Sequence, residues 1–186
     1  SCDWSSDVCS SDLNAPSEGA VTTSCKCCAD AGPQDAVLLT VKAHQVRDLL
    51  PDLRGLFGPQ TVVVTMINGV PWWYFHRLSE PWEGQRLDSV DPGGEIQAHI
   101  EPERIIGSVV YPAAELVEPG VVRVIEGNRF TLGELDGSDT PSIRAIADAF
   151  KAAVVTKAGL EVVSTDIHPQ NAPDFPSILT RLQQRR

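Results

Sequence analysis

Apolar residues gather into short runs and spaced faces from residue 36 to about residue 150. The run Ala36–Val41 does not alternate with polar residues, which predicts a strand buried on both faces of a parallel sheet. A second such run spans Thr61–Met66. Between the two runs, apolar residues recur at helical spacing: Val46, Leu49, Leu50, Leu53, Leu56 and Phe57. The order predicts a βαβ unit with a right-handed crossover.

Proline and glycine mark the expected boundaries of these elements. Pro51 is expected to divide the helical region into two short pieces, and Gly58–Pro59 to end it. Residues 71–94 are expected to form a loop that carries Trp72, Trp73, Tyr74, Phe75 and Trp82. Because large apolar patches are normally covered, we expect the run 72–75 to pack under a domain outside this chain, with a substrate or dimer surface as the alternative.

The second half predicts strands and one further helix. Ile105–Tyr111 is expected to be a third strand, and Val121–Ile125 and Phe130–Leu132 are expected to pair as a β-hairpin around residues 126–129. Thr140 followed by Pro141 predicts a helix start. Ile143, Ile146, Ala147 and Phe150 supply the apolar face of that helix.

Composition narrows the class of protein. The chain has 186 residues, 42% of them hydrophobic and 22% charged, as expected of a globular chain that buries a core. The net charge of −10 argues against a nucleic-acid partner. No apolar run is long enough to span a membrane and no signal peptide is recognisable, so we expect a cytoplasmic protein without a membrane partner.

The amino-terminal end differs from the rest. All five cysteines lie within the first 28 residues, and residues 3–13 resemble the translation of a sequencing-adapter oligonucleotide. We therefore expect residues 1–13 to be a disordered artefact, with an ordinary Ser/Asp-rich tail as the alternative. Cys25, Cys27 and Cys28 form a single cluster without the second pair that a structural zinc site normally has, so we expect no metal site.

Two segments that follow the predicted strands can carry chemistry. The chain has no Gly-rich dinucleotide loop, Walker A loop, HExxH or GxSxG motif. Lys42 follows the first strand, and Asn68–Gly69 follows the second, where ligands bind in open α/β sheets. Lys42 either contacts a phosphate or ribose or is a solvated residue at a strand end. Asn68–Gly69 either presents an amide to a ligand or forms a simple turn.

Three longer segments bring these residues into a recognisable context. The segments DAVLLTVKAHQV, TVVVTMINGVPWW and SVVYPAAELVEPGVVRVIEGNRFTLGE strongly resemble the ketopantoate reductase family (2-dehydropantoate 2-reductase). The resemblance covers about residues 32–167. It implies an α/β fold, here a partial Rossmann-type NAD(P)-binding domain of parallel strands with a β-hairpin.

The resemblance also implies an activity and a site. Family members reduce 2-dehydropantoate to pantoate with NADPH, in pantothenate and coenzyme A biosynthesis. By resemblance, Lys42, Gln45, Asn68, Gly69 and the backbone of Ala114 bind the cofactor, and Asn68 also meets the substrate. A small 2-oxoacid is the implied partner, and a homodimer is implied for the full-length protein.

The resemblance is incomplete at both ends. The first βα unit and the carboxy-terminal helical domain of the family are not recognisable, so residues 14–167 are expected to be the partial domain and residues 168–186 an aperiodic tail, with a frame shift near Ile167. The catalytic lysine of the family lies beyond the matched region, and Lys151 and Lys157 do not occupy its position. The chain alone is therefore expected to be inactive. The alternatives are a non-catalytic interaction module and a related NAD(P)-dependent 2-hydroxyacid dehydrogenase.

Overall fold

The computed structural model describes residues 31–78, 81–118, 121–127, 129–152 and 161–164. Its main sheet has the strand order β1-β2-β3-β6-β7, with β1 to β3 mutually parallel, β6 antiparallel to β3, and β7 parallel to β6. These strands are β1 (Gln34–Leu39), β2 (Phe57–Thr65), β3 (Ile105–Val110), β6 (Arg129–Glu134) and β7 (Glu161–Ser164). Strands β4 (Ala113–Glu118) and β5 (Val121–Glu126) form a separate antiparallel ribbon.

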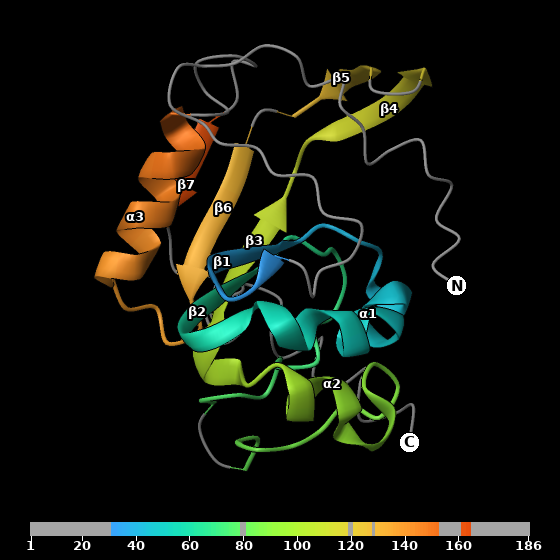
Figure 1. The fold of residues 1–186 in the computed structure, drawn as a ribbon, viewed down its shortest axis with the longest axis vertical. Helices are drawn as coiled ribbons and strands as arrows, with labels where there is room; N and C mark the ends of the chain where they lie inside the picture. Colours follow the sequence, from blue (N-terminus) through green and yellow to red (C-terminus); the bar gives the residue numbers. More distant parts are fainter. Residues whose placement is uncertain (1–30, 79–80, 119–120, 128, 153–160, 165–186) are drawn as a thin grey trace.

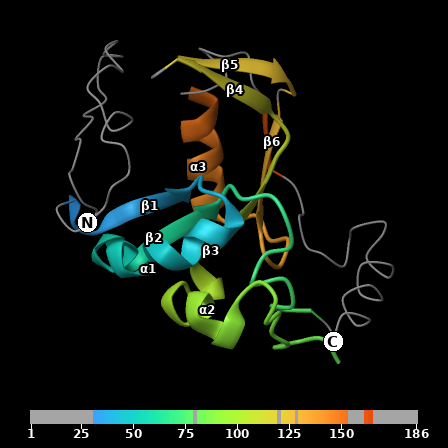
Figure 2. The ribbon, with the colours of Figure 1, turned by 90° about the vertical axis from the view of Figure 1, so that its right-hand side faces the viewer.

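Helices cover the two faces of the main sheet (Figures 1 and 2). Helices α1 (Val46–Leu53) and α2 (Glu95–His99) lie on one face, where Leu50 and Ile96 share a core with Val63 of β2. Helix α3 (Pro141–Phe150) lies on the other face, where Ile143 packs against Val64. The chain therefore has the mixed α/β fold that the sequence predicted.

The βαβ unit β1–α1–β2 is confirmed, but its boundaries differ from the prediction. Helix α1 continues through Pro51 and ends at Leu53. The missing N–H of Pro51 removes one helical bond near the end of a short helix, while Leu50 and Leu53 remain buried against the sheet. A 3₁₀ turn (Arg54–Leu56) follows, and Gly58–Pro59 belongs to β2 instead of ending the helix.

The predicted hairpin was wrong in its pairing. Strand β5 pairs with β4, and β6 pairs with β3 and β7. Both β5 and β6 therefore lie on one arm of a long antiparallel hairpin, and β3 and β4 form the other arm. The arms bend together where Tyr111 and Pro112 meet Gly127, so the outer part leaves the main sheet as the ribbon that projects in Figure 1. A pattern of strand-forming residues gives no information on such a bend.

Other predicted elements have mixed outcomes. The Thr140 cap is confirmed, because its Oγ1 accepts the Ile143 N–H at 3.3 Å at the start of α3. Strand β7 was not predicted. Three further 3₁₀ turns complete the described elements: Ala43–Gln45, Pro92–Gly94 and Pro102–Arg104. Predictions for residues 1–13, Cys25, Cys27, Cys28, Lys157 and the tail 168–186 lie outside the described residues.

The aromatic run 72–75 is buried within this chain, which contradicts the expectation that a further domain covers it. Trp72, Trp73, Tyr74 and Phe75 are at most 8% exposed. Trp72 and Trp73 join the core beneath α1, while Phe75 stacks on Trp82 with ring centroids 6.2 Å apart. In the described part of residues 71–94, Tyr74 and Phe75 pack with Leu78, Leu87 and Trp82, so these two aromatics are buried within the domain.

Candidate functional site at the carboxyl ends of the parallel strands

Three parallel strands end at one edge of the sheet. The Met66 N–H donates to the Leu39 carbonyl at 2.9 Å, which extends the pairing of β1 and β2 to their ends. The Asn68 side chain then reaches β3, where its Nδ2 donates to the Val110 carbonyl at 3.3 Å. This bond orients the amide and leaves its Oδ1 and its second N–H for a ligand. The edge is thus built from β1, β2 and β3 together.

A pocket opens at this edge between α1 and the loop after β2. Its lining is largely apolar and contains no charged side chain. The lining residues are Ala43, Val46, Thr65, Ile67, Asn68, Gly69, Val70, Pro71, Trp72, Val90 and Ile96. Gly69 has φ of +113°, a conformation that side-chain-bearing residues rarely adopt. Asn68 and Gly69, both predicted site residues, therefore belong to this pocket.

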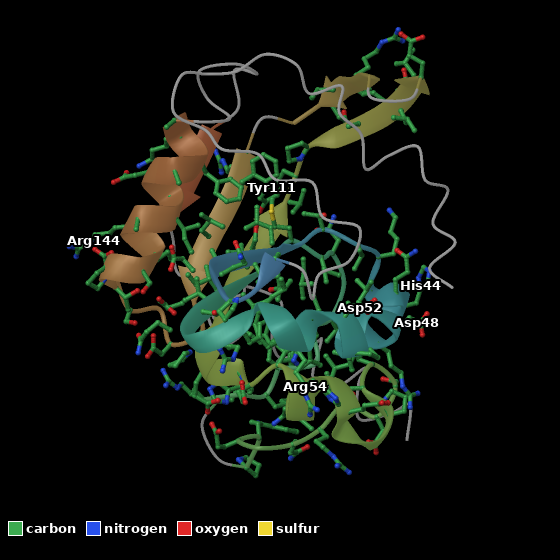
Figure 3. All side chains as sticks on the ribbon, viewed as in Figure 1. His44, Asp48, Asp52, Arg54, Tyr111 and Arg144 are labelled. Atoms are coloured by element: carbon green, nitrogen blue, oxygen red, sulfur yellow. The ribbon has the colours of Figure 1, made fainter. Side chains whose placement is uncertain are left out.

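Lys42 and Gln45 border the pocket without lining it. They flank Ala43, a lining residue, in the turn that leads from β1 into α1. Gln45 Oε1 accepts the Lys42 N–H at 3.0 Å, and the Gln45 N–H donates to the Lys42 carbonyl at 2.9 Å. The bonds of Gln45 thus shape the turn, and the Lys42 side chain is exposed. Neighbouring His44 lies at the outer surface beside α1 (Figure 3).

Ala114 lies apart from the pocket residues, on β4 of the ribbon. It is exposed and pairs with Val124 at a register shift. It follows Val110, the partner of Asn68, by four residues, and Tyr111 marks the bend between them (Figure 3). The structure therefore connects Ala114 to the site edge only through the β3–β4 arm.

One wall of the pocket depends on a buried carboxylate that sequence reasoning missed. Asp91 is 3% exposed, and its two oxygens accept the N–H groups of Ile96 and Gln97 at 2.8 and 3.0 Å. Val90 and Ile96, on either side of this contact, both line the pocket. The available signal in the sequence was the run Pro92–Gly93–Gly94, which indicates a tight turn directly after Asp91. In the structure both glycines of this turn have positive φ.

Sequence reasoning also missed Thr65, and it named Trp72 only within the aromatic run 72–75, for which a substrate or dimer surface was the alternative role. Thr65 shares a face of β2 with Val63 and thus points toward α1, as the period of two along a strand requires. A polar residue within the apolar run 61–66 was the available signal. Trp72 lines the pocket from the loop that follows β2.

Two negative findings concern only the described residues. They contain no group of three His, Cys, Asp or Glu side chains arranged to hold a metal ion. Among the same residues, no helix is long and apolar enough to cross a membrane.

A parallel βαβ unit with a pocket at the carboxyl ends of its strands is typical of nucleotide-binding α/β domains. The family model described as "Ketopantoate reductase PanE/ApbA" matches residues 5–72, which include β1, α1 and β2. The match also includes residues 5–13, within the segment that resembles an adapter.

Curated relatives and solved structures agree with this match. The 2-dehydropantoate 2-reductase of Mesorhizobium japonicum is 47% identical over 137 residues, which are 74% of this chain and 40% of the relative. The uncharacterized oxidoreductase YkpB of Bacillus subtilis is 24% identical over 136 residues, 71% of this chain and 38% of that protein. The chain thus spans about 40% of the curated relatives it matches.

Two solved structures support the fold. A crystallised candidate ketopantoate reductase from Ralstonia solanacearum has a TM-score of 0.67 at 38% identity, over 75% of this chain and 42% of that one. The 2-dehydropantoate 2-reductase of Geobacter metallireducens has a TM-score of 0.54 at 26% identity, over 75% of this chain and 38% of that one. The resemblance to the ketopantoate reductase family, an oxidoreductase family, is therefore confirmed.

Proposed function

We propose that the protein carrying this chain reduces 2-dehydropantoate to pantoate with NADPH, as a step of pantothenate and coenzyme A biosynthesis. The observation that carries the proposal is the pocket at the ends of β1 and β2, with Asn68 and Gly69 in its lining, in a chain 47% identical to a 2-dehydropantoate 2-reductase. Lys42 and Gln45 border the same edge, and Ala114 lies on the ribbon beyond the end of β3; we propose all three as further cofactor contacts.

The residues of the pocket fit a nicotinamide. A planar ring with apolar faces suits the aliphatic and indole side chains that line the pocket. When bound, the cofactor supplies a hydride to the ketone carbon of the substrate. The chain itself contributes an apolar wall that excludes water and an amide, Asn68, held in place by the Val110 carbonyl.

Turnover by the protein as its gene encodes it tests the proposal. We expect NADPH oxidation, followed by absorbance, on 2-dehydropantoate, and slower oxidation of NADH. Asn68→Ala should lower kcat/KM roughly tenfold or more, since it removes an oriented hydrogen-bonding group. Gln60→Ala, which removes an exposed amide from the opposite end of β2, is the control and should leave kcat/KM unchanged.

The outcomes separate the alternatives. Turnover confined to another 2-oxoacid would reject the substrate and keep the class of enzyme, as for a related 2-hydroxyacid dehydrogenase. Absence of turnover and of cofactor binding would favour a non-catalytic module. A homodimer and a cytoplasmic location stay predictions, which sedimentation and cell fractionation check.

A further inference from the structure

One dipeptide of the candidate site has the chemistry for a spontaneous reaction. Asn68 is followed by Gly69, and no other asparagine in the sequence precedes a glycine. In such a pair the backbone nitrogen of the glycine can attack the side-chain amide carbon of the asparagine, because no Cβ atom crowds the attacking nitrogen. Whether a folded protein allows this attack depends on the surroundings of the two residues.

The structure leaves both reacting groups accessible. Asn68 and Gly69 are exposed, and a Cβ atom built on Gly69 would meet nothing within 4 Å apart from its chain neighbours. The Gly69 N–H donates no hydrogen bond to any described residue. The Asn68 side chain makes one hydrogen bond among the described residues, from its Nδ2 to the Val110 carbonyl, and its length of 3.3 Å exceeds the usual range.

A second dipeptide that can form the same ring is held differently. Asp136 precedes Gly137, and an aspartate forms the ring by losing water instead of ammonia. Here the Gly137 N–H donates to the Glu134 carbonyl at 3.1 Å. Arg77 pairs with one oxygen of the Asp136 carboxylate, and the other oxygen accepts the Ser138 N–H at 3.0 Å. The attacking nitrogen and the attacked group are therefore both occupied at this position.

We propose that Asn68–Gly69 is a self-modification site, at which Asn68 is converted into aspartate and isoaspartate. The Gly69 nitrogen gives its proton to water or hydroxide and bonds to Asn68 Cγ, and the side-chain amide nitrogen leaves as ammonia. Water then opens the resulting succinimide ring. Opening at Cγ gives aspartate, and opening at the main-chain carbonyl carbon gives isoaspartate. The net reaction exchanges ammonia for water, and no atom is oxidised or reduced.

The modification changes the site in charge and in backbone geometry. Aspartate replaces a neutral amide with an anion that cannot donate, so the hydrogen bond to the Val110 carbonyl is lost. Isoaspartate in addition directs the main chain through Cγ and so displaces Gly69. The effect on turnover rests on the proposed function, in which Asn68 contacts the cofactor and the substrate. On that basis, the protein loses activity as the modification accumulates.

Incubation of the folded, gene-encoded protein in water labelled with heavy oxygen tests the proposal. Ring opening places a heavy oxygen atom at residue 68, and peptide mapping by mass spectrometry locates it. We expect label at Asn68 well before it appears at the other asparagines in the sequence, Asn14, Asn128 and Asn171. Asn68→Gln should acquire label far more slowly, because its longer side chain requires a less favourable six-membered ring.

Asp136→Asn provides the matched comparison, because it places a second asparagine before a glycine in the same chain. In the folded variant we expect label at Asn68 about tenfold faster than at residue 136, the rate factor that corresponds to one hydrogen bond on the glycine nitrogen. In urea, where the Gly137 N–H loses its partner, the two positions should acquire label at similar rates.

The activity of the incubated protein measures the consequence. We expect kcat/KM for 2-dehydropantoate to fall as label accumulates, and bound NADPH to slow the labelling, because the cofactor covers Asn68. Asn68→Asp, which reproduces one product, should lower kcat/KM about tenfold or more. The kcat/KM of Asn68→Gln, lower from the start, should not fall further during the incubation.

Several results would overturn the proposal. Label at residue 68 in urea but not in the folded wild type would refute it, because the fold then prevents the attack. Equal labelling of residues 68 and 136 in folded Asp136→Asn would refute the role of the unbonded Gly69 N–H. If that variant melts much lower than wild type, wild-type labelling at Asn68 no faster than at Asn128 refutes the proposal in its place.

Two further results separate the modification from its consequence. A kcat/KM that stays constant while label accumulates at residue 68 would refute the loss of activity. Label at residue 68 in a protein that never oxidises NADPH would leave the modification site intact and refute the proposed function instead.

Discussion

Gly127 occupies the point where the long hairpin bends out of the main sheet. Its φ is +76°, and a Cβ atom built there would lie 2.7 Å from the Tyr111 carbonyl oxygen and 3.0 Å from Pro112 Cα. Backbone from the opposite arm is therefore in direct contact with the glycine. Only a residue without a side chain allows the two arms to cross this closely.

Gly127→Ala should consequently lower the free energy of unfolding. The matched substitution is Gly84→Ala, where φ is +72° but nothing lies within 4 Å of the added Cβ. Gly84→Ala measures backbone strain alone, about 1 kcal/mol. Gly127→Ala should cost about 1–2 kcal/mol more, because the backbone must also move. Equal costs in urea unfolding would show that the close approach to Tyr111 contributes nothing.

Among the elements, α2 depends on a residue outside it. Its five residues are too few for a helix to persist by its own propensity. Asp91 holds its first turn by accepting two backbone N–H groups, and the same contact keeps Val90 and Ile96 at the pocket. Substitution of Asp91 should therefore lower the free energy of unfolding and disturb the pocket at the same time.

Asp91→Ala should lower the free energy of unfolding by about 2 kcal/mol, because two N–H groups lose their partner. It should also weaken NADPH binding by moving the pocket wall. Asp88→Ala is the control. The Asp88 side chain is exposed, and its one ion pair, with Arg86 at 3.9 Å, is long and therefore weak. Chemical denaturation and cofactor titration of both variants provide the check, and equal effects would contradict the assigned role.

The molecule as a whole should lose stability in acid. The Arg104 hydrogen bond lowers the pKa of Glu101, the Ser138 hydroxyl and N–H lower that of Asp136, and the Arg144 hydrogen bond lowers that of Asp139. A lowered carboxyl pKa means that the unfolded chain takes up protons first as the pH falls. The stabilisation is therefore complete above about pH 5, where the unfolded carboxyl groups are also ionised, and is lost progressively as the pH falls below it.

Melting temperatures between about pH 5 and pH 2 test this expectation. A triple variant that combines Glu101→Gln, Asp136→Asn and Asp139→Asn should lose less stability than wild type as the pH falls over that range. Its control changes Asp35, Asp52 and Glu83, for which the structure describes no ion pair, to the corresponding amides. An equally shallow profile in the control would assign the acid sensitivity to net charge instead.

Local patterns were sufficient for the elements that depend on neighbours in sequence. The apolar runs placed β1, β2 and β3, helical spacing placed α1 and α3, and Thr140 placed the start of α3. The turns after β1 and β2 located Asn68 and Gly69, because carboxyl ends of parallel strands meet at one edge. These inferences need only the periods of strand and helix and the chemistry of caps.

Contacts between distant residues decided the remainder. The pairing of β5 with β4 depends on the bend where Gly127 meets Tyr111, and the burial of the run 72–75 depends on its packing against α1 and against Leu78 and Leu87. Thr65, Trp72 and Asp91 could be assigned to the site only from the structure, because the packing of β2, the loop after it and α2 brings them together. The sequence determined the segments that form β1, β2, β3, α1 and α3, and the positions of the candidate site residues that follow the first two strands. Tertiary packing alone decided the strand partners and the pocket wall, because both depend on contacts that no local period encodes.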